Sequence, residues 1–584
     1  MRGMRWRMGL AVLALCAILA GLLPHHFAAT SASDSLKRQI ERATGLVPEL
    51  APGATLKLLP WPRLRFDHLT LRQNGHIKLE AKAIEVPLAP NWPAIWKRSG
   101  LNARLISPSF SINLDHLLPD WAQPDGALVF PALAKALPDV VRHLALADAH
   151  ITLIGSNLRQ PLTLEHVAAI FESRGKSGPE ALRFAGMAGG GPFTGRAWFG
   201  RASHGANPVD LAISGPWAAG ASKGYWHVGA AAYVGNLEFA SRSQRWIMGF
   251  KGPVTNLLHK ASQVELNAHI KLLRGQIDAS DIRGSVDGQS FRGLVALERH
   301  GTVNRLSGTL AAQQWVLPDA ILNGDLLARN PITSTSMAPS GRNRPPPLAV
   351  DLRVSVAHLI WRTLNLSNLA LALSSHGGPL KLDLAQADLG GGTLRGAIVV
   401  DSHKSTKSLQ AALHVSKIPI SAICRLLVCP DPFSGLLTAD ASLTAALGAT
   451  QSLATALSGH GAFILRHGAL PGPDLGRWLR WQARHEGPLP PIANAEGTVY
   501  NQMSGEIYFK AGGPAALAFS LASSALHAKA AGVINPATMT LDLKASARQI
   551  LSAPSTTETP AKLNFKIKGS LTHPRLSMST PLAQ

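Results

Sequence analysis

Apolar and polar residues alternate along most of the chain after residue 45. Clear examples are 63–71, 350–356 and 563–568, where Leu, Val, Ile or Phe stands at nearly every second position. Such alternation is typical of a β-strand with one apolar face. Segments of this kind recur about every 8–15 residues, separated by Gly, Pro, Asn-Gly or Asp-Gly, without the strand–helix rhythm of a parallel α/β fold. The pattern predicts a mainly β fold, with a long antiparallel sheet of roughly 30 strands and a few short helices.

Two short segments have helical periodicity instead. We predict a helix over 35–43, with its apolar face lying on the first strands, and a second helix over 474–485. The second helix supplies four candidates for a membrane interface, Trp478, Trp481, Arg477 and Arg480. Tryptophan and arginine suit a membrane surface or an anionic head group. A structural cap with solvated arginines fits the same residues, and the sequence leaves both readings open.

The N-terminal segment has the pattern of a membrane anchor. Three arginines within residues 1–7 precede an apolar run over 8–23, and no Lys or Arg follows until Lys37. Counted to Ala29, the segment is long enough to span a bilayer, and the charge asymmetry places its N-terminus in the cytoplasm. We predict a single-pass anchor over 1–29. The alternative is a signal peptide cleaved among the small residues of 29–33.

Charge narrows the possible partners. The 584 residues include 57 Lys and Arg against 35 Asp and Glu, which gives a net charge of +22. With 46% hydrophobic and 16% charged residues, the chain is not a disordered one. The cations are scattered singly along alternating segments, without zinc-finger spacing or another nucleic-acid motif, so we expect no nucleic-acid partner. A negatively charged membrane surface explains the basic balance equally well.

No signature of catalysis or metal binding is present. The sequence lacks H-E-x-x-H and the phosphate-binding G-x-x-x-x-G-K-[ST], and its 22 His are dispersed. We therefore expect a protein that is not an enzyme and has no cofactor and no metal. Cys424 and Cys429 form the one plausible disulfide pair, and a reduced pair is an equal alternative.

The body has a weak internal repeat and one long loop. Similar segments surround Gly195, Gly293 and Gly396, with a poorer copy at Gly505, although hairpins punctuated by glycine resemble one another in any case. Residues 330–347 are rich in Ser, Thr, Pro and Gly and are predicted to be a flexible loop. We divide the chain into the anchor at 1–29, an N-terminal β-meander with a short helix at 30–150, an extended sheet at 151–435 and a C-terminal module at 436–584.

Both ends of the body resemble the AsmA family. The N-terminal stretch over 36–115 contains Leu58-Leu59-Pro60-Trp61-Pro62-Arg63-Leu64-Arg65-Phe66, followed by strand-like runs at 81–88 and 106–114. A second stretch, Leu457-Ser458-Gly459-His460-Gly461-Ala462-Phe463, is similar to the C-terminal part of the family, and 565–574 is similar to its closing strand and turn. The resemblance implies an anchor in the inner membrane of a Gram-negative bacterium, a periplasmic body with a long, half-open, apolar β-groove, and a role in phospholipid transport and outer-membrane biogenesis.

A long sheet with one apolar face must cover that face. Acyl chains in a curled groove can cover it, and so can a second sheet in a closed sandwich. The residues proposed to line the groove are Val350, Leu352, Val354 and Val356. Periodicity alone slightly favours the sandwich, whereas the resemblance favours the groove. The expected partners are phospholipid, the inner membrane and, further out, the outer membrane or its assembly proteins. The rival functions are a non-catalytic assembly factor for outer-membrane proteins and a structural tether of the envelope.

Overall fold

The fold is that of a computed structural model. It describes residues 25–27, 30–44, 46–59, 61–73, 76–88, 101–113, 141–155, 160–174, 178–227, 230, 232–241, 243, 263–273, 275–300, 303–317, 348–361, 364–376, 378–401, 407–427, 434–447, 456–470, 472–484, 497–535, 538–550, 560–570 and 574–578. The chain divides into two compact units, unit 1 with residues 1–288 and 296–299 and unit 2 with residues 289–295 and 300–584.

Unit 1 consists almost wholly of β-strands. They are β1 (His25–Phe27), β2 (Val47–Glu49), β3 (Ala54–Lys57), β4 (Arg63–Gln73), β5 (His76–Pro87), β6 (Leu101–Asn113), β7 (Val141–Ile154), β8 (Leu162–Ser173), β9 (Glu180–Ala188), β10 (Gly191–Phe199), β11 (Ala206–Ser214), β12 (Ala218–His227), β13 (Ala232–Ser241), β14 (Val264–Leu273) and β15 (Gln276–Val286). Strand β16 (Gln289–His300) contributes residues to both units.

Unit 2 continues the same construction. Its strands are β17 (Val303–Val316), β18 (Leu348–Trp361), β19 (Leu364–His376), β20 (Leu380–Leu389), β21 (Gly392–Asp401), β22 (Lys407–Pro419), β23 (Leu436–Leu447), β24 (Leu457–Leu470), β25 (Thr498–Phe509), β26 (Ala515–Ala522), β27 (Leu526–Asn535), β28 (Thr540–Gln549), β29 (Lys562–Ser570) and β30 (Pro574–Met578). The mainly β prediction is confirmed, and the described residues contain thirty strands.

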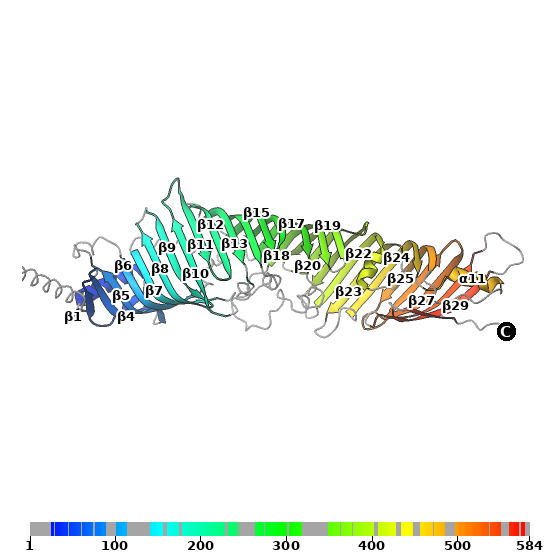
Figure 1. Ribbon diagram of the computed structural model, residues 1–584, viewed down its shortest axis with the longest axis horizontal. Coiled ribbons are helices and arrows are strands. Elements are labelled where there is room, and N and C mark those ends of the chain that lie inside the picture. The colour runs from blue at the N-terminus through cyan, green and yellow to red at the C-terminus, as the bar shows by residue number, and fades with distance from the viewer. Residues whose placement is uncertain are drawn as a thin grey trace, which may run out of the picture. The chain divides into compact units, whose positions relative to one another are not determined.

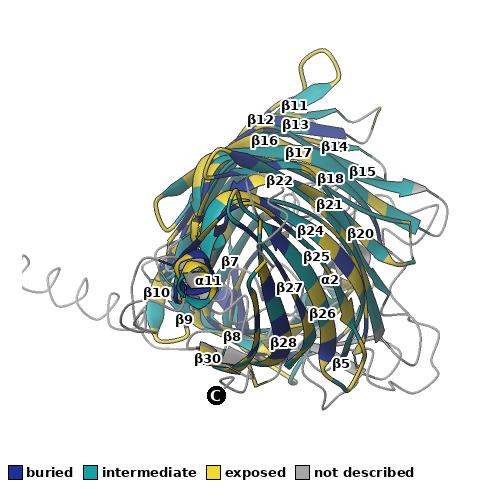
Figure 2. Cartoon of the chain, turned by 90° about the vertical axis from the view of Figure 1, so that its right-hand side faces the viewer, coloured by how far each residue is buried: buried dark blue, intermediate teal, exposed yellow. Residues whose placement is uncertain are grey.

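Each strand pairs with the next along the chain from β4 to β15 and from β17 to β30. From β4 to β15 and from β17 to β30 the strands lie side by side in sequence order (Figure 1), whereas β1 pairs with β3, and both β2 and β3 pair with β4. Strands β24 to β28 bend around as a single layer in Figure 2. Each unit is therefore an open, curled sheet, as predicted.

The antiparallel order is broken twice, which the sequence analysis did not predict. Strand β6 runs parallel to β7, and β17 runs parallel to β18. Parallel neighbours need a connection that returns the chain to the starting end of the first strand, and such crossovers take a dozen or more residues. Both pairs have long connections, at 114–140 and 317–347. The predicted loop at 330–347 falls in the second connection and lies outside the described residues.

Left-handed residues interrupt neighbouring strands and help to curl the sheet. In unit 1, Ser107, Asp148 and His166 have φ angles of 45°, 56° and 51° on β6, β7 and β8, where the pairing register shifts. Asp148 accepts a hydrogen bond from the Ser107 hydroxyl at 3.2 Å, and its carboxylate lies 2.7 Å from His166 Nδ1. The hydrogen bond with His166 lowers the pKa of Asp148 below its usual value. Bulges of this kind bend and twist a sheet locally. Unit 2 has left-handed residues at Asn368, Lys417 and His467.

Three copies of the weak repeat occupy equivalent places. The strands around Gly195, Gly293 and Gly396 each follow a two-residue turn, which consists of Gly189-Gly190, Asp287-Gly288 or Gly390-Gly391. Both central residues of each turn have positive φ, as a type I′ hairpin turn requires. The copy at Gly505 lies in β25, which follows no such turn. The repeat thus marks the second strand of a tight hairpin.

In the described part of the chain three helices accompany the sheets, namely α2 (Thr30–Thr44), α9 (Ile420–Leu427) and α11 (Leu475–Arg484). Helix α2 contains the predicted helix over 35–43 but begins earlier, and it buries Leu36 and Ile40 against Leu64 and Phe66 of β4. Helix α11 agrees with the prediction over 474–485. Cys424 lies in α9, whereas Cys429 lies outside the described residues, so the disulfide stays a prediction.

Only the end of the predicted membrane anchor can be compared with the structure. Residues 1–24 lie outside the described residues. None of the helices in the described part of the chain has the length and hydrophobicity of a membrane span. The predicted extension of the span to Ala29 is wrong, because His25–Phe27 form β1 and pair with β3. Pro24 precedes this strand, and proline disfavours helical backbone at the residue before it and removes a helical N–H.

Candidate functional site

An uninterrupted line of apolar residues crosses unit 2 from its first to its last strand. Residues paired directly across two strands point to the same face of a sheet. Following these pairs from Val354 in both directions gives one residue per strand, and every one is aliphatic or glycine. We call this line the open row: Leu310, Val354, Leu371, Leu384, Gly396, Leu413, Ala441, Gly461, Ile507, Leu517, Gly532, Leu543, Ile567 and Leu576.

The face that carries the open row is the apolar face of unit 2, and the other is its polar face. Along β18 the apolar face holds Val350, Leu352, Val354 and Val356, while Asp351, Arg353 and Ser355 point the other way. The four residues proposed from the sequence therefore share one face. Leu352 stands in a neighbouring apolar line with Leu373, Leu382 and Ile398.

Unit 1 has a line of the same kind. It passes through Phe66, Ile84, Leu105, Leu146, Ala169, Phe184, Gly195, Ile213, Gly220, Phe239, Leu266 and Gly284, one residue on each strand from β4 to β15. The side chain of Ile213 is 53% exposed in the middle of this line. Both units thus present a continuous apolar strip across their strands.

The open row is neither sealed nor fully exposed. Val350, Leu352 and Val354 are half-buried, and Val356 is buried with 6% exposure. In a closed sandwich the inner faces of two sheets interdigitate and form a core. The strands of unit 2 instead form one sheet in which most side chains of the open row are half-buried, and Leu543 is buried with 4% exposure. This arrangement favours the open groove over the sandwich.

Helix α11 covers one border of the apolar face. Beneath it runs a second line, the covered row: Leu437, Leu465, Met503, Leu521, Ala528, Ala547 and Leu563. The helix residues Leu475, Trp478 and Leu479 join six of these seven in one buried cluster, with Leu437 packed against it. On β26, Leu521 of the covered row is 1% exposed, whereas Phe519 and Leu517 are half-buried. On β26, burial thus decreases from the helix toward the open row.

The four candidates for a membrane interface differ in how far they are buried. Trp478 is 3% exposed and belongs to the core, with its ring 6.2 Å from the half-buried ring of Trp481. Arg477 and Arg480 are exposed on the opposite side of the helix. This is the arrangement of a structural cap with solvated arginines. A membrane contact through Arg477, Arg480 and Trp481 stays a prediction.

Hydrogen bonds hold α11 at this border. Its first turn is capped by Asp474, whose carboxylate accepts a hydrogen bond from the Gly476 N–H at 2.9 Å. The buried Thr498 hydroxyl accepts from the Leu475 N–H at 3.1 Å and donates to the Pro473 carbonyl at 2.7 Å. The start of the helix is therefore tied to the first residue of β25.

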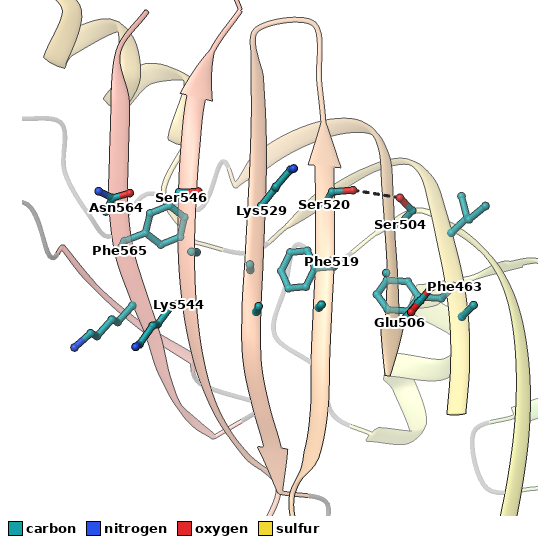
Figure 3. A pocket seen from close by; sticks show the side chains of 18 of the residues that line it. Phe463, Ser504, Glu506, Phe519, Ser520, Lys529, Lys544, Ser546, Asn564 and Phe565 are labelled. Atoms are coloured by element: carbon teal, nitrogen blue, oxygen red, sulfur yellow. Dashed lines mark hydrogen bonds between the residues drawn. The ribbon is translucent and has the colours of Figure 1, made fainter. Parts of the chain in front are cut away.

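A hollow of about 1120 Å³ lies against β23 to β29. Figure 3 shows Phe463, Phe519 and Phe565 together with Glu506, Lys529 and Lys544 around it. Consecutive residues of a strand point to opposite faces, so the phenylalanines belong to the apolar face and the charged residues to the polar face. Residues of both faces therefore contribute to the lining of the hollow, which does not belong to the apolar face alone. We therefore take the apolar face itself as the candidate site.

The chemistry available on this face is apolar contact. Aliphatic side chains bind hydrocarbon without directional preference, and each CH₂ group removed from water contributes about 0.8 kcal/mol. Fourteen strands spaced by ~4.8 Å make the open row roughly 62 Å long. Elsewhere in the described part of the chain, no three His, Cys, Asp or Glu side chains are close enough to hold a metal ion.

The sequence analysis missed most of this site. Leu371, Leu413 and Leu543 lie in the open row, but only cross-strand register brings them into line with Val354. Each of them occupies an apolar position of an alternating segment. Alternation indicates which face of the sheet a residue lies on, but not which residue lies opposite it on the next strand. The sequence therefore identified the face but not the row.

Comparison with known families supports the resemblance seen in the sequence. Residues 313–507, which are 195 of the 584 residues, match the model of the AsmA family. The match includes the stretch that begins at Leu457, whereas the proposed similarities at 36–115 and 565–574 lie outside it. No curated protein and no solved structure matches the chain. The resemblance to the AsmA family is therefore confirmed over residues 313–507 of this chain.

Proposed function

We propose that the chain binds lipid acyl chains on the apolar face of unit 2 and so contributes to phospholipid transport and outer-membrane biogenesis. The observation that carries the proposal is the open row, which runs across fourteen paired strands without one polar side chain. The protein is anchored in the inner membrane by its N-terminal segment, and its body lies in the periplasm. It performs no catalysis and needs no cofactor.

Hydrocarbon is the ligand that fits this surface. A polar substrate would need hydrogen-bonding partners to replace those it loses from water, and the open row offers no polar side chain for that purpose. An acyl chain needs only apolar area, and the phosphate-bearing head group can stay in water at the open side. Since neighbouring patches of the row are chemically alike, moving from one to the next changes the free energy little. Lipids can therefore slide along the row.

The match of residues 313–507 to the AsmA family supports an envelope-related role. The finer statements, namely phospholipid as ligand, the inner-membrane anchor and the periplasmic location, rest on the resemblance and on the N-terminal charge asymmetry. The half-buried state of Val350, Leu352 and Val354 supports a surface that a ligand can reach.

Photocrosslinking in cells tests the proposal at neighbouring positions of one strand. A photoreactive phenylalanine analogue replaces Val354 on the apolar face or Ser355 on the polar face of the full-length protein. Cells are labelled with radioactive phosphate and irradiated, and the purified protein is examined for attached lipid by autoradiography and mass spectrometry. We expect phospholipid attached at position 354 at least tenfold above position 355.

Two further positions make the pattern specific. Leu543 of the open row is expected to give lipid, and the adjacent Lys544 is expected to give none. Equal labelling at all four positions would mean non-specific contact with membrane and would contradict the proposal. Absence of lipid at 354 and 543, with protein adducts at the sheet edge β30 instead, would favour an assembly factor that pairs with client strands.

A further inference from the structure

Positive charge is concentrated on the polar face of the last four strands. Seven cations from β27 to β30 point to this face: Lys529, Lys544, Arg548, Lys562, Lys566, Lys568 and Arg575. We call them the basic face. All seven are exposed residues, and the side chain of Lys568, which forms an ion pair, is still 57% exposed. Asp542 is the one carboxylate on this face in the described residues of the four strands.

The register places these cations against one another. Lys544 is directly opposite Lys566, Arg548 is opposite Lys562, and Lys568 is opposite Arg575. Like charges in direct cross-strand positions repel and destabilise the sheet. Asp542 binds the Lys568 ammonium at 2.8 Å. Within the residues that the structure describes, the other six cations have no carboxylate partner at ion-pair distance.

The composition of the basic face indicates the kind of partner. Protein interfaces are enriched in aromatic residues and arginine and depleted of lysine, and proteins that bind single-stranded nucleic acids use aromatic rings for base stacking. Five of the seven cations here are lysines. Phe565 is the single Phe, Tyr or Trp of the described residues in β27 to β30, and it belongs to the apolar face. Lysines without aromatic anchors suit a diffuse negative surface.

We propose that the basic face docks the C-terminal end of the chain onto an anionic phospholipid bilayer. Each basic residue near such a surface contributes about a fivefold factor to binding. Bound anionic head groups would also relieve the repulsion between the three opposed pairs. The inference does not depend on acyl-chain binding, because the basic face and the open row lie on opposite faces of the same strands.

Vesicle binding by the full-length protein tests this proposal. The purified chain is mixed with vesicles of phosphatidylcholine alone or of seven parts phosphatidylcholine to three parts phosphatidylglycerol, and the bound fraction is measured by flotation. The difference between the two vesicle types removes any contribution from hydrophobic insertion. We expect tighter binding to the anionic vesicles, decreasing with added salt. The variant with Lys544→Gln, Lys562→Gln and Lys566→Gln should lose about a hundredfold of that preference.

A matched control has the same loss of charge elsewhere. Lys223→Gln, Lys381→Gln and Lys510→Gln remove three exposed lysines outside the basic face, and this variant should keep its preference for anionic vesicles. Equal losses in both variants would reduce the effect to net charge and overturn the proposal, as would equal binding of the unmodified protein to both vesicle types.

Two further measurements distinguish membrane binding from loss of folding and from general binding of polyanions. The midpoint of thermal unfolding should be unchanged or higher in the variant of the basic face, because two repulsive pairs are removed, so a loss of binding cannot be ascribed to unfolding. Single-stranded polythymidine serves as a competitor. If it binds as tightly as the anionic vesicles and loses affinity in the same variant, the basic face is a general polyanion site and the membrane assignment is wrong. Lipid crosslinking at Val354 is measured separately and reports only on the groove.

Discussion

Tyr500 shows how single side chains fix the covered border of the apolar face. It is 1% exposed, and its hydroxyl donates a hydrogen bond of 2.6 Å to the carbonyl of Ser434, far away in sequence. Burial raises the pKa of Tyr500 to about 12. The folded state therefore favours the neutral phenol of Tyr500, since ionisation would place a charge in the core.

Replacing Tyr500 by Phe should have two measurable effects. At neutral pH the variant should lose about 1–2 kcal/mol of stability, because the Ser434 carbonyl loses its donor. The folded-state pKa lies above the ordinary value near 10, so the tyrosine contributes stability below pH 10 that is lost as the pH rises toward 12. The midpoint temperature of thermal unfolding should therefore fall more steeply between pH 9 and pH 11 in the unmodified protein than in Tyr500→Phe. Parallel curves would mean that Tyr500 does not titrate as a buried group.

Among the elements, α11 packs on the sheet through one large buried side chain. Trp478 lies in the core, yet its buried indole N–H has no hydrogen-bond partner among the residues that the structure describes. Trp478→Ala should destabilise unit 2 by about 3–5 kcal/mol, because a large cavity is left against the covered row. Trp478→Phe should cost less than about 2 kcal/mol, since the aromatic packing is largely kept and an unsatisfied donor is removed.

Denaturant unfolding followed by circular dichroism measures both variants. Arg477→Ala, on the exposed side of the same helix, is the control and should change stability by less than about 0.5 kcal/mol. A cost for Arg477→Ala as large as that for Trp478→Ala would show that the arginines, and not the buried tryptophan, hold the helix.

Elements were also what the sequence predicted best. The alternating segments 350–356 and 563–568 lie within β18 and β29, and the helix over 474–485 corresponds to α11. Alternation reports which face a residue occupies, but it carries no information on the neighbouring strand or its direction. The parallel pairs β6–β7 and β17–β18 were therefore missed. The basic face was missed for the same reason, because Lys544 and Lys566 are isolated charges until β28 and β29 are placed in register.

At the scale of the whole molecule, the question is whether lipids move along the open row or only bind to it. The row has no polar member that would hold a head group at one place. Glycine or alanine interrupts its larger aliphatic side chains over at most two consecutive strands, at Ala441 and Gly461. A carboxylate introduced at Val354 would create a hydrated interruption that an acyl chain must leave the surface to pass.

We therefore expect Val354→Glu to lower lipid crosslinking at the distant position Leu543 at least threefold in cells, because lipids that enter the row near β17 must pass position 354. Ser355→Glu adds the same charge on the polar face one residue away and should leave crosslinking at 543 unchanged. Both variants are compared at equal protein level, with circular dichroism as the check of folding. If Val354→Glu abolishes lipid contact at its own position and leaves position 543 unaffected, each segment of the row exchanges lipid independently with its surroundings. The open row is then a set of binding sites, and directional transport along it is excluded.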